Sequence, residues 1–393
     1  MFKKTSFIIL WLALTFQVSA QPFQDFLEKV SANNPEITAL RKLLEARRAE
    51  ARTGYLPPDP VVSAGFMPGN TEAAGNKKTW TVSQSFDFPL KYLLQKKIGG
   101  SNTLLAEEEF RLGYMLIMLE AGHTLFDLIY TERSLRKLNE RKEDYERLRS
   151  AWESMLENGE ATIMDFNNVL LELSVVNLEI SRKEAEFAML KEKIEYMGGI
   201  PLNNAWIEEY PSFSVPGPDA LLAERSASHP YFLIPELEYR IGNQELKLSR
   251  TGSLPSIQLG YTSEIVPDMS YTGPVAGLSV PLWNNSGRVR SASAAADHLE
   301  KARDAELLKL ASETRRDYAE MLALLKSLDE IRVLLASTEG SKYPDRALEA
   351  GEISLAAYFN YLDLLYRTED RLLELENEYN KALAAILDYR LPE

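Results

Sequence analysis

The sequence has 393 residues, of which 45% are hydrophobic and 26% charged, so it can bury sizeable cores and carries no compositional sign of disorder. Its formal net charge of -14 disfavours nucleic acid or an anionic membrane surface as a partner. It contains no cysteine, which excludes disulfides and a thiol that could accept an N-terminal lipid.

The first twenty residues, MFKKTSFIILWLALTFQVSA, are typical of a secretory signal peptide. Lys3 and Lys4 precede an apolar run, and small residues up to Ala20 suggest cleavage before Gln21. An N-terminal membrane anchor is the alternative, but about ten apolar residues are half of the ~20 that a spanning helix needs. We therefore expect export, and we expect no transmembrane helix in the mature chain.

The remainder of the sequence consists of two similar halves. Pro89 in SFDFPL and Pro281 in LSVPLW lie 192 positions apart, and so do Gly159 in LENGEATIMDF and Gly351 in LEAGEISLAAY. Upstream, ARTGYLPPDP matches SRTGSLPSIQ with small shifts in spacing. The order of parts is the same in both halves, which indicates a duplication. We predict a signal peptide at 1–20, a first repeat at 21–199, a connecting segment at 200–219 and a second repeat at 220–393.

Each repeat begins with a helical pattern followed by two runs of alternating residues. The expected helices are 36–52 and 231–250. The expected strands are 61–67 and 79–88 in the first repeat, and 256–266 and 274–283 in the second. The loops between the strands are PGNTEAAGNKK and PDMSYTG.

A helical hairpin ends each repeat. The segments 101–157 and 288–349 contain no proline except Pro344, and their apolar residues recur in steps of three and four, as in a coiled coil. After a short break the helices 163–197 and 355–389 follow, with apolar positions displaced by 192. So short a connection folds the chain back on itself, which makes each pair antiparallel.

The breaks carry specific turn chemistry. Gly159 and Gly351 can take the positive φ that ends a helix, and Thr162 with Asp165 forms a capping box for the next helix. Ser354 can cap the second copy, but without a reciprocal acceptor. These residues could serve as turn formers and nothing more.

The strands are amphipathic. Apolar side chains share one face in each repeat, namely Trp80, Val82, Phe86 and Phe88 in the first and Ile257, Leu259 and Tyr261 in the second. In a soluble β-layer such a face needs a core beneath it, whereas in a membrane barrel it contacts lipid and the polar face lines water. Four strands cannot close a barrel alone, so the membrane interpretation requires an oligomer.

The duplicated order, ARTGYLP and SRTGSLP before strands, SFDFP and LSVPL before long helices, and NGEATIMDF and AGEISLAAY at the turns together resemble the TolC-type outer-membrane efflux channel family (outer membrane factors). The resemblance implies a mostly α protein with a small β part, built from two tandem repeats of helix, strand, strand and long antiparallel hairpin. It implies a homotrimer in which four strands per chain complete a 12-stranded transmembrane β-barrel, joined to an α-helical barrel.

The resemblance also implies a function. The chain would be the passive exit duct of a tripartite efflux system in the outer membrane of a Gram-negative-type bacterium, with most of its mass in the periplasm. Its partners would be outer-membrane lipid, a periplasmic adaptor and an inner-membrane pump. The adaptor would dock at the hairpin turns, at Asn158, Gly159, Glu160, Thr162, Asp165, Ala350, Gly351, Glu352 and Ser354. Some relatives carry acidic residues after the second glycine turn, where this chain has Ala357 and Asn360.

No motif for chemistry is present. The three histidines, His123, His229 and His298, lie in separate elements, and no metal, nucleophile or phosphate-loop motif occurs. We expect no catalytic, metal or cofactor residues and no enzymatic activity. The alternative function is a non-conducting periplasmic coiled-coil scaffold, which leaves the aromatic strand faces unexplained.

Overall fold

A computed structural model describes residues 21–70, 75–199, 209–281, 283, 285–338 and 342–390. The predicted signal peptide lies outside these residues, as do residues 200–208 of the predicted connecting segment.

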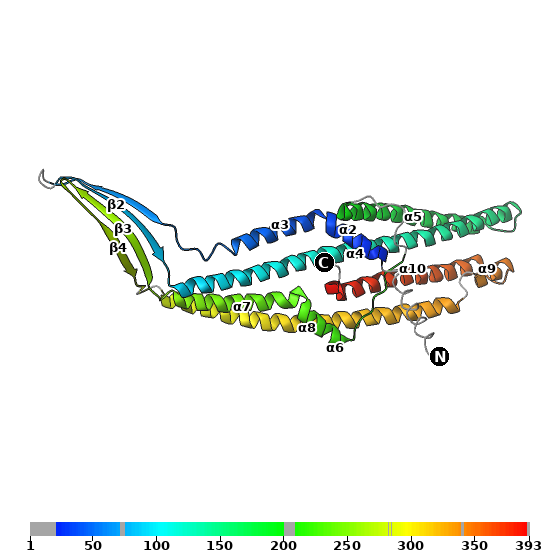
Figure 1. Ribbon diagram of the computed structural model, residues 1–393. Coiled ribbons are helices and arrows are strands. Elements are labelled where there is room, and N and C mark those ends of the chain that lie inside the picture. The colour runs from blue at the N-terminus through cyan, green and yellow to red at the C-terminus, as the bar shows by residue number, and fades with distance from the viewer. Residues whose placement is uncertain are drawn as a thin grey trace, which may run out of the picture. The chain divides into compact units, whose positions relative to one another are not determined.

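The described chain contains two sets of helices and two pairs of strands (Figure 1). The helices are α2 (Gln21–Asn33), α3 (Pro35–Glu50), α4 (Pro89–Glu157), α5 (Ile163–Gly198), α6 (Pro218–Ser228), α7 (Pro230–Thr251), α8 (Asn285–Ser337), α9 (Lys342–Glu349) and α10 (Leu355–Ile386), followed by a 3-10 turn at Asp388–Arg390. The strands are β1 (Val61–Met67), β2 (Lys77–Phe86), β3 (Ser256–Val266) and β4 (Met269–Ser279). The predicted class, mostly helical with a small β part, is confirmed.

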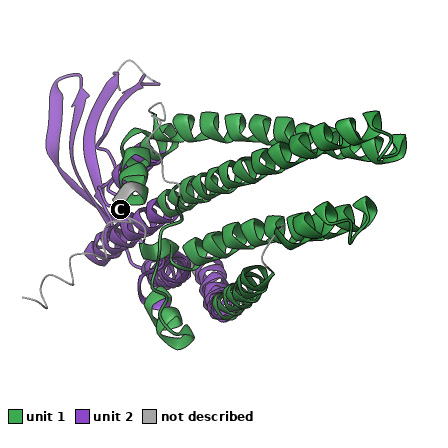
Figure 2. Cartoon of the chain, turned by 90° about the vertical axis from the view of Figure 1, so that its right-hand side faces the viewer, with its two compact units in different colours: residues 1–39, 113–225, 312–393 green, residues 40–112, 226–311 purple. Residues whose placement is uncertain are grey.

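The chain forms two compact units (Figure 2). The hairpin unit comprises residues up to 39, 113–225 and from 312 onward, and the sheet unit comprises 40–112 and 226–311. Both units draw residues from both sequence repeats, and α4 and α8 contribute to both.

One antiparallel sheet in the order β1-β2-β3-β4 lies in the sheet unit. The central pair, β2 and β3, joins the two sequence repeats, with Val82 opposite Tyr261 and Thr81 opposite Thr262. Directly opposed residues share a face of the sheet, so this register aligns the apolar positions of the two repeats.

Two strand predictions need correction. β2 ends at Phe86, so Phe88, which the alternation placed in the strand, lies beyond it. β4 begins at Met269, and the predicted loop PDMSYTG is wrong, because Val266 and Met269 are directly opposed and only Pro267 and Asp268 connect them. Proline presets the first turn position, and aspartate tolerates the positive φ of 60° found at Asp268.

The first long helix begins earlier than predicted. α4 begins at Pro89 instead of Ser101, and proline is accepted there because the first helical N–H has no partner within the helix in any case. The helix continues through Gly99, where a Cβ would lie 2.3 Å from the carbonyl oxygen of Ala51. Glycine at this position therefore permits the close approach of the chain after α3, although it weakens helical propensity.

The second long helix is interrupted, contrary to the prediction of one helix over 288–349. α8 ends at Ser337, and α9 begins at Lys342 with Pro344 in its first turn. Inside a continuous helix this proline would lack a donor and clash with the carbonyl four residues earlier, whereas the first turn of a new helix accepts it.

The predicted coiled-coil positions form cores in the hairpin unit. One core contains Leu138 and Tyr145 of α4 and Leu173, Val176 and Ile180 of α5. A second contains Val169 of α5 and Leu355, Tyr358, Leu362 and Leu365 of α10. A third surrounds Phe23 and Phe126, whose stacked rings lie 5.5 Å apart. Burial of these side chains stabilises both hairpins and joins them to each other.

One described helix, α4, is long and apolar enough to span a membrane by length and composition alone. The window that meets this criterion has a mean hydropathy of 1.3, and 61% of it is buried inside the protein. Met118, Leu125 and Phe126 of this helix belong to the core around Phe23. Such burial is typical of the core helix of a folded domain.

Candidate functional site

The two hairpin turns have the same backbone geometry. Gly159 has φ 76° and Gly351 has φ 71°. In both turns the next N–H donates across the helix end, from Glu160 to the carbonyl of Met155 and from Glu352 to that of Ala347, each at 2.8 Å. Each glycine N–H also donates to the carbonyl three residues earlier. This is the Schellman arrangement, which explains why glycine is needed at both positions.

The helices after the turns are capped as the sequence predicted. Thr162 Oγ1 accepts the N–H of Asp165 at 3.2 Å, and the Asp165 carboxylate accepts the N–H of Thr162 at 3.2 Å and its hydroxyl at 2.6 Å. Ser354 accepts the N–H of Ala357 at 3.2 Å without a reciprocal bond. The Asp165 carboxylate therefore takes part in its own helix cap.

Both turns present open surface. A Cβ at Gly159 or Gly351 would meet no atom within 4 Å. The other predicted turn residues are exposed, apart from half-buried Asp165. Their role in binding a partner remains a prediction.

The predicted apolar strand face is exposed in the chain. The exposed fractions are Trp80 55%, Val82 52%, Phe86 39%, Phe88 44%, Ile257 49%, Leu259 51% and Tyr261 57%. The register places Phe86 opposite Ile257, and the outer strands add Val62 opposite Val82 and Leu278 opposite Ile257. A soluble β-layer would pack this face on a core, but here it is left uncovered.

The opposite face of the sheet is polar. One row across the four strands consists of Ser63, Thr81, Thr262 and Gly273, and the two threonine hydroxyls are hydrogen bonded at 2.8 Å. Lys77 pairs with Glu264 at 2.7 Å, and Gln258 Nε2 donates to Ser83 Oγ at 2.9 Å. The sheet thus has one face suited to an apolar medium and one suited to water.

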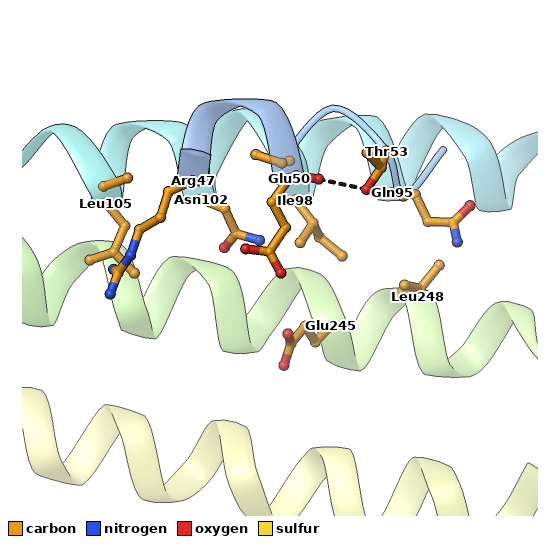
Figure 3. Close-up of a pocket in the computed structure, with 13 residues that line it drawn as sticks. Arg47, Glu50, Thr53, Gln95, Ile98, Asn102, Leu105, Glu245 and Leu248 are labelled. Atoms are coloured by element: carbon orange, nitrogen blue, oxygen red, sulfur yellow. Dashed lines mark hydrogen bonds between the residues drawn. The ribbon is translucent and has the colours of Figure 1, made fainter. Parts of the chain in front are cut away.

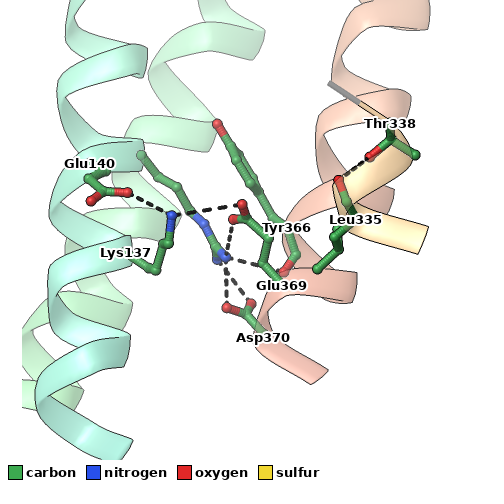
Figure 4. Close-up of polar contacts among 8 residues, drawn as sticks. Lys137, Glu140, Leu335, Thr338, Tyr366, Glu369 and Asp370 are labelled. Carbon is green, nitrogen blue, oxygen red and sulfur yellow. Dashed lines mark hydrogen bonds and ion pairs between the residues drawn. The ribbon is translucent and has the colours of Figure 1, made fainter. Parts of the chain in front are cut away.

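A buried arginine connects the two hairpins (Figure 4). Arg141 of α4 has a side chain only 5% exposed, and its two terminal nitrogens donate to the carboxylate of Asp370 of α10 at 2.9 and 2.7 Å. The guanidinium also lies 4.4 Å from the centre of the Tyr366 ring and donates to the Tyr366 carbonyl at 3.2 Å. Burial lowers the pKa of Arg141, but its hydrogen bonds and the charge of Asp370 outweigh burial, so the pKa is raised.

Further polar contacts follow the same line between α4 and α10. Arg133 pairs with Glu376 at 3.1 Å, and Asp127 accepts from Lys381 at 2.5 Å and from Asn377 at 2.8 Å. We call these contacts, together with that of Arg141, the α4–α10 seam. Sequence reasoning missed it, because complementary charges on helices more than 200 positions apart leave no local pattern.

Replacing Arg141 by Met should destabilise the hairpin unit by about 2 kcal/mol or more, because it leaves the Asp370 carboxylate and the Tyr366 carbonyl without this donor. Unfolding in guanidinium, followed by circular dichroism, measures the loss. Arg147→Met is the matched control, since that side chain is 71% exposed and pairs with Asp144 of the same helix. Equal midpoints for the two variants would contradict a structural role for the seam.

Carboxylates also gather between the hairpins. Burial raises the pKa of Glu172 on α5, and the charges of Asp363 and Glu179 raise it further. The folded chain thus holds this proton more tightly than the unfolded chain. The resulting stabilisation is complete below the unfolded pKa and is lost as the pH rises through the folded pKa.

The sheet unit contains a pocket of about 550 Å³ between α3, α4 and α7 (Figure 3). Its lining mixes charged and apolar side chains, including Arg47, Glu50, Asn102, Glu245 and Leu248. Across the part of the chain that the structure describes, no three His, Asp or Glu side chains are grouped to hold a metal. The absence of a cofactor remains a prediction.

Comparison with known proteins shows similarity at the level of structure. No protein-family model and no curated protein matches the sequence. Among solved structures, that of CusC, described for its folding and transmembrane channel formation, superposes with a TM-score of 0.80 at 15% identity, covering 93% of this chain and 92% of that one. The outer membrane protein VceC of Vibrio cholerae gives 0.79 at 12% identity, covering 94% and 97%. The outer membrane channel CmeC of Campylobacter jejuni gives 0.76 at 13% identity, covering 94% and 85%.

These likenesses cover nearly the whole chain and include both the sheet and the paired hairpins. The fold predicted from the duplicated sequence is therefore confirmed. The chain has the fold of the outer-membrane channel proteins to which it is similar.

Proposed function

We propose that this chain is one subunit of an outer-membrane efflux channel, acting as a passive exit duct. The observation that carries the proposal is the uncovered apolar face of the four-stranded sheet, backed by a polar face. The fold, shared with proteins described as outer membrane channels, supports it.

The number of strands in each chain determines how many chains are needed to close a barrel. Four strands leave two open sheet edges, β1 and β4, and the smallest membrane barrels have about eight strands. Pairing β4 of one copy with β1 of the next closes a barrel, and three copies give one of twelve strands. The apolar face then contacts lipid, and the row of Ser63, Thr81, Thr262 and Gly273 faces the lumen.

The hairpin turns supply the contact with the rest of the export system. Because each chain has two similar turns, a trimer has six similar tips. At each tip the glycine is exposed, with free space around it. A periplasmic adaptor tied to an inner-membrane pump would dock there. Solutes then diffuse through water in the lumen, without covalent chemistry.

Conductance in planar bilayers tests the function. The chain, purified in detergent from outer membranes, should form heat-resistant trimers and open stable pores. A non-conducting scaffold predicts instead a protein released by osmotic shock, soluble without detergent and silent in bilayers. That result would overturn the channel proposal.

A further inference from the structure

The helix ends next to the sheet carry an excess of basic charge. α4 and α8 each begin within a few residues of the end of a strand, and their first carboxylates come only at Glu107 and Asp297. Before those positions α4 carries three lysines and α8 carries two arginines. The whole chain has a net charge of -14, so this part of the sheet unit differs in charge from the rest of the sequence.

Four basic residues occupy equivalent places in the two repeats. Lys96 near the start of α4 and Arg288 at the start of α8 are separated by 192 positions, the spacing of the duplication. Arg52 of ARTG, just after α3, corresponds to Arg250 of SRTG near the end of α7. We call Arg52, Lys96, Arg250 and Arg288 the basic junction.

Three members of the basic junction lie at one level beside the sheet. Thr53 and Gln95, the chain neighbours of Arg52 and Lys96, line the same pocket between α3, α4 and α7 (Figure 3). The member on α7 comes two residues after Leu248, which lines this pocket too. The pocket therefore brings the ends of three helices, each with its basic residue, close together.

The fourth member lies at the same level because α7 and α8 are antiparallel. A Cβ on Gly242 of α7 would lie 3.8 Å from the Cα of Ala296 of α8. Arg250 comes eight residues later along α7, and Arg288 comes eight residues earlier along α8. Both are therefore about 12 Å from this contact in the direction of the sheet.

The side chains of the basic junction have no acidic partner. All four residues are exposed, and their side chains form no hydrogen bond or ion pair with the residues that the structure describes. Lys91 differs, because it pairs with Asp87 at 2.6 Å. Arg288 lies in the first turn of α8, where the helix dipole disfavours a cation. These positions favour an anion that comes from outside the chain.

Exposed apolar side chains lie between the sheet and the basic junction. On α4, Leu90 and Leu93 are 43% and 66% exposed, and Lys96 follows Leu93 by three residues on the same side of the helix. Between β4 and Arg288, Trp283 is 88% exposed, and tryptophan is typical of the membrane–water interface. Moving away from the sheet, apolar residues thus come first and basic residues second, which is the order of lipid tails and headgroups.

The distances agree with the depth of a headgroup layer. Lys96 is seven residues from the start of α4 and Arg288 three residues from the start of α8, which correspond to about 10 and about 5 Å. Headgroups add about 5–8 Å on each side of the hydrocarbon core. Charges more than about 10 Å away are screened by salt, so the net charge of the whole chain does not decide this local contact.

We propose that the basic junction binds the phosphate groups of anionic phospholipids in the membrane leaflet on the helical side of the sheet. The proposal rests on the proposed function, because it requires the sheet to lie in a membrane. The apolar face of the sheet contacts lipid tails whatever their headgroup, whereas the basic junction selects lipids of negative charge. A trimer presents the four residues three times.

Quenching of tryptophan fluorescence by brominated lipid tests this preference. The trimer is reconstituted in vesicles of equal parts phosphatidylglycerol and phosphatidylcholine, with one or the other lipid brominated. Trp283, five residues before Arg288, reports on lipid at the junction. Each basic residue near a membrane surface attracts an anionic headgroup about fivefold. Brominated phosphatidylglycerol should therefore quench about twofold more strongly than brominated phosphatidylcholine, and salt should reduce the difference.

Three sets of substitutions assign the preference to these residues. Removing the four charges should make quenching by the two lipids equal, with Arg52→Gln, Lys96→Gln, Arg250→Gln and Arg288→Gln. The matched control removes the same charges from exposed positions of the hairpin unit and should keep the difference, with Lys29→Gln, Arg149→Gln, Arg182→Gln and Arg315→Gln. Exchanging the basic residues should also keep it, with Arg52→Lys, Lys96→Arg, Arg250→Lys and Arg288→Lys.

The outcomes separate this contact from the channel function. The variant without the four charges should still conduct, because its strands are unchanged. Equal quenching of a conducting wild-type trimer, a preference that survives loss of the basic junction, or one that is lost in the control would overturn the lipid site and leave the channel intact. A protein that neither enters vesicles nor conducts would overturn both proposals.

Discussion

Leu259→Arg should prevent assembly of the channel in the membrane. Leu259 lies on the uncovered apolar face of the central strand β3, 51% exposed. An arginine on the lipid face of a membrane barrel destabilises by about 2–4 kcal/mol at the bilayer midplane and by less near the interfaces. The change occurs once per subunit, so a trimer bears it three times. The fraction of heat-resistant trimer in outer-membrane extracts is the measurement.

Gln258→Arg is the control for this prediction. Gln258 is the preceding residue of β3 and lies on the polar face, where it donates to Ser83. Its arginine would project into water, so the variant should assemble and show altered ion selectivity in planar bilayers. Equal trimer yields for Leu259→Arg and Gln258→Arg would contradict contact of the apolar face with lipid.

Gly159→Leu combined with Gly351→Leu should abolish adaptor-dependent export while leaving the trimer intact. Both glycines have positive φ, where a residue with a Cβ is disfavoured by about 1–2 kcal/mol. Each change therefore distorts its turn and adds bulk to an open surface. The core of Leu138, Tyr145, Leu173, Val176 and Ile180 lies along the helices, away from both turns, so it should hold the hairpins together.

An efflux assay in cells measures the loss of export, and the yield of trimer shows whether assembly is intact. Gly100→Leu serves as the control, since that glycine lies within α4 and has no atom near an added Cβ. The control should export normally. Unchanged export by the double variant would exclude the turns as the docking site.

Local patterns in the sequence were sufficient for most of the fold. Alternation of apolar and polar residues predicted β1 and β3 at their observed bounds, and heptad spacing predicted the cores of both hairpins. Turn chemistry predicted the positive φ of Gly159 and Gly351 and the capping box at Thr162. Each of these signals acts between neighbours in the chain.

Predictions failed where local signals conflicted. The loop predicted over PDMSYTG is wrong, because Pro267 and Asp268 alone connect the strands and Asp268 takes the positive φ of a tight turn. The single helix predicted over 288–349 is wrong at Pro344, which lies in the first turn of the separate helix α9. Gly99, a weak helix former, lies within α4 where the chain after α3 approaches closely.

The sequence by itself determined the duplication, the amphipathic strands and the two hairpins, because these depend on short-range periodicity and on repeated order. Only the tertiary structure decided which helices meet. It joined Arg141 to Asp370 across the two repeats, and it left Leu171 and Leu178 of α5 and the apolar face of the sheet exposed. Contacts between distant segments depend on packing and charge in three dimensions, and no local spacing encodes them.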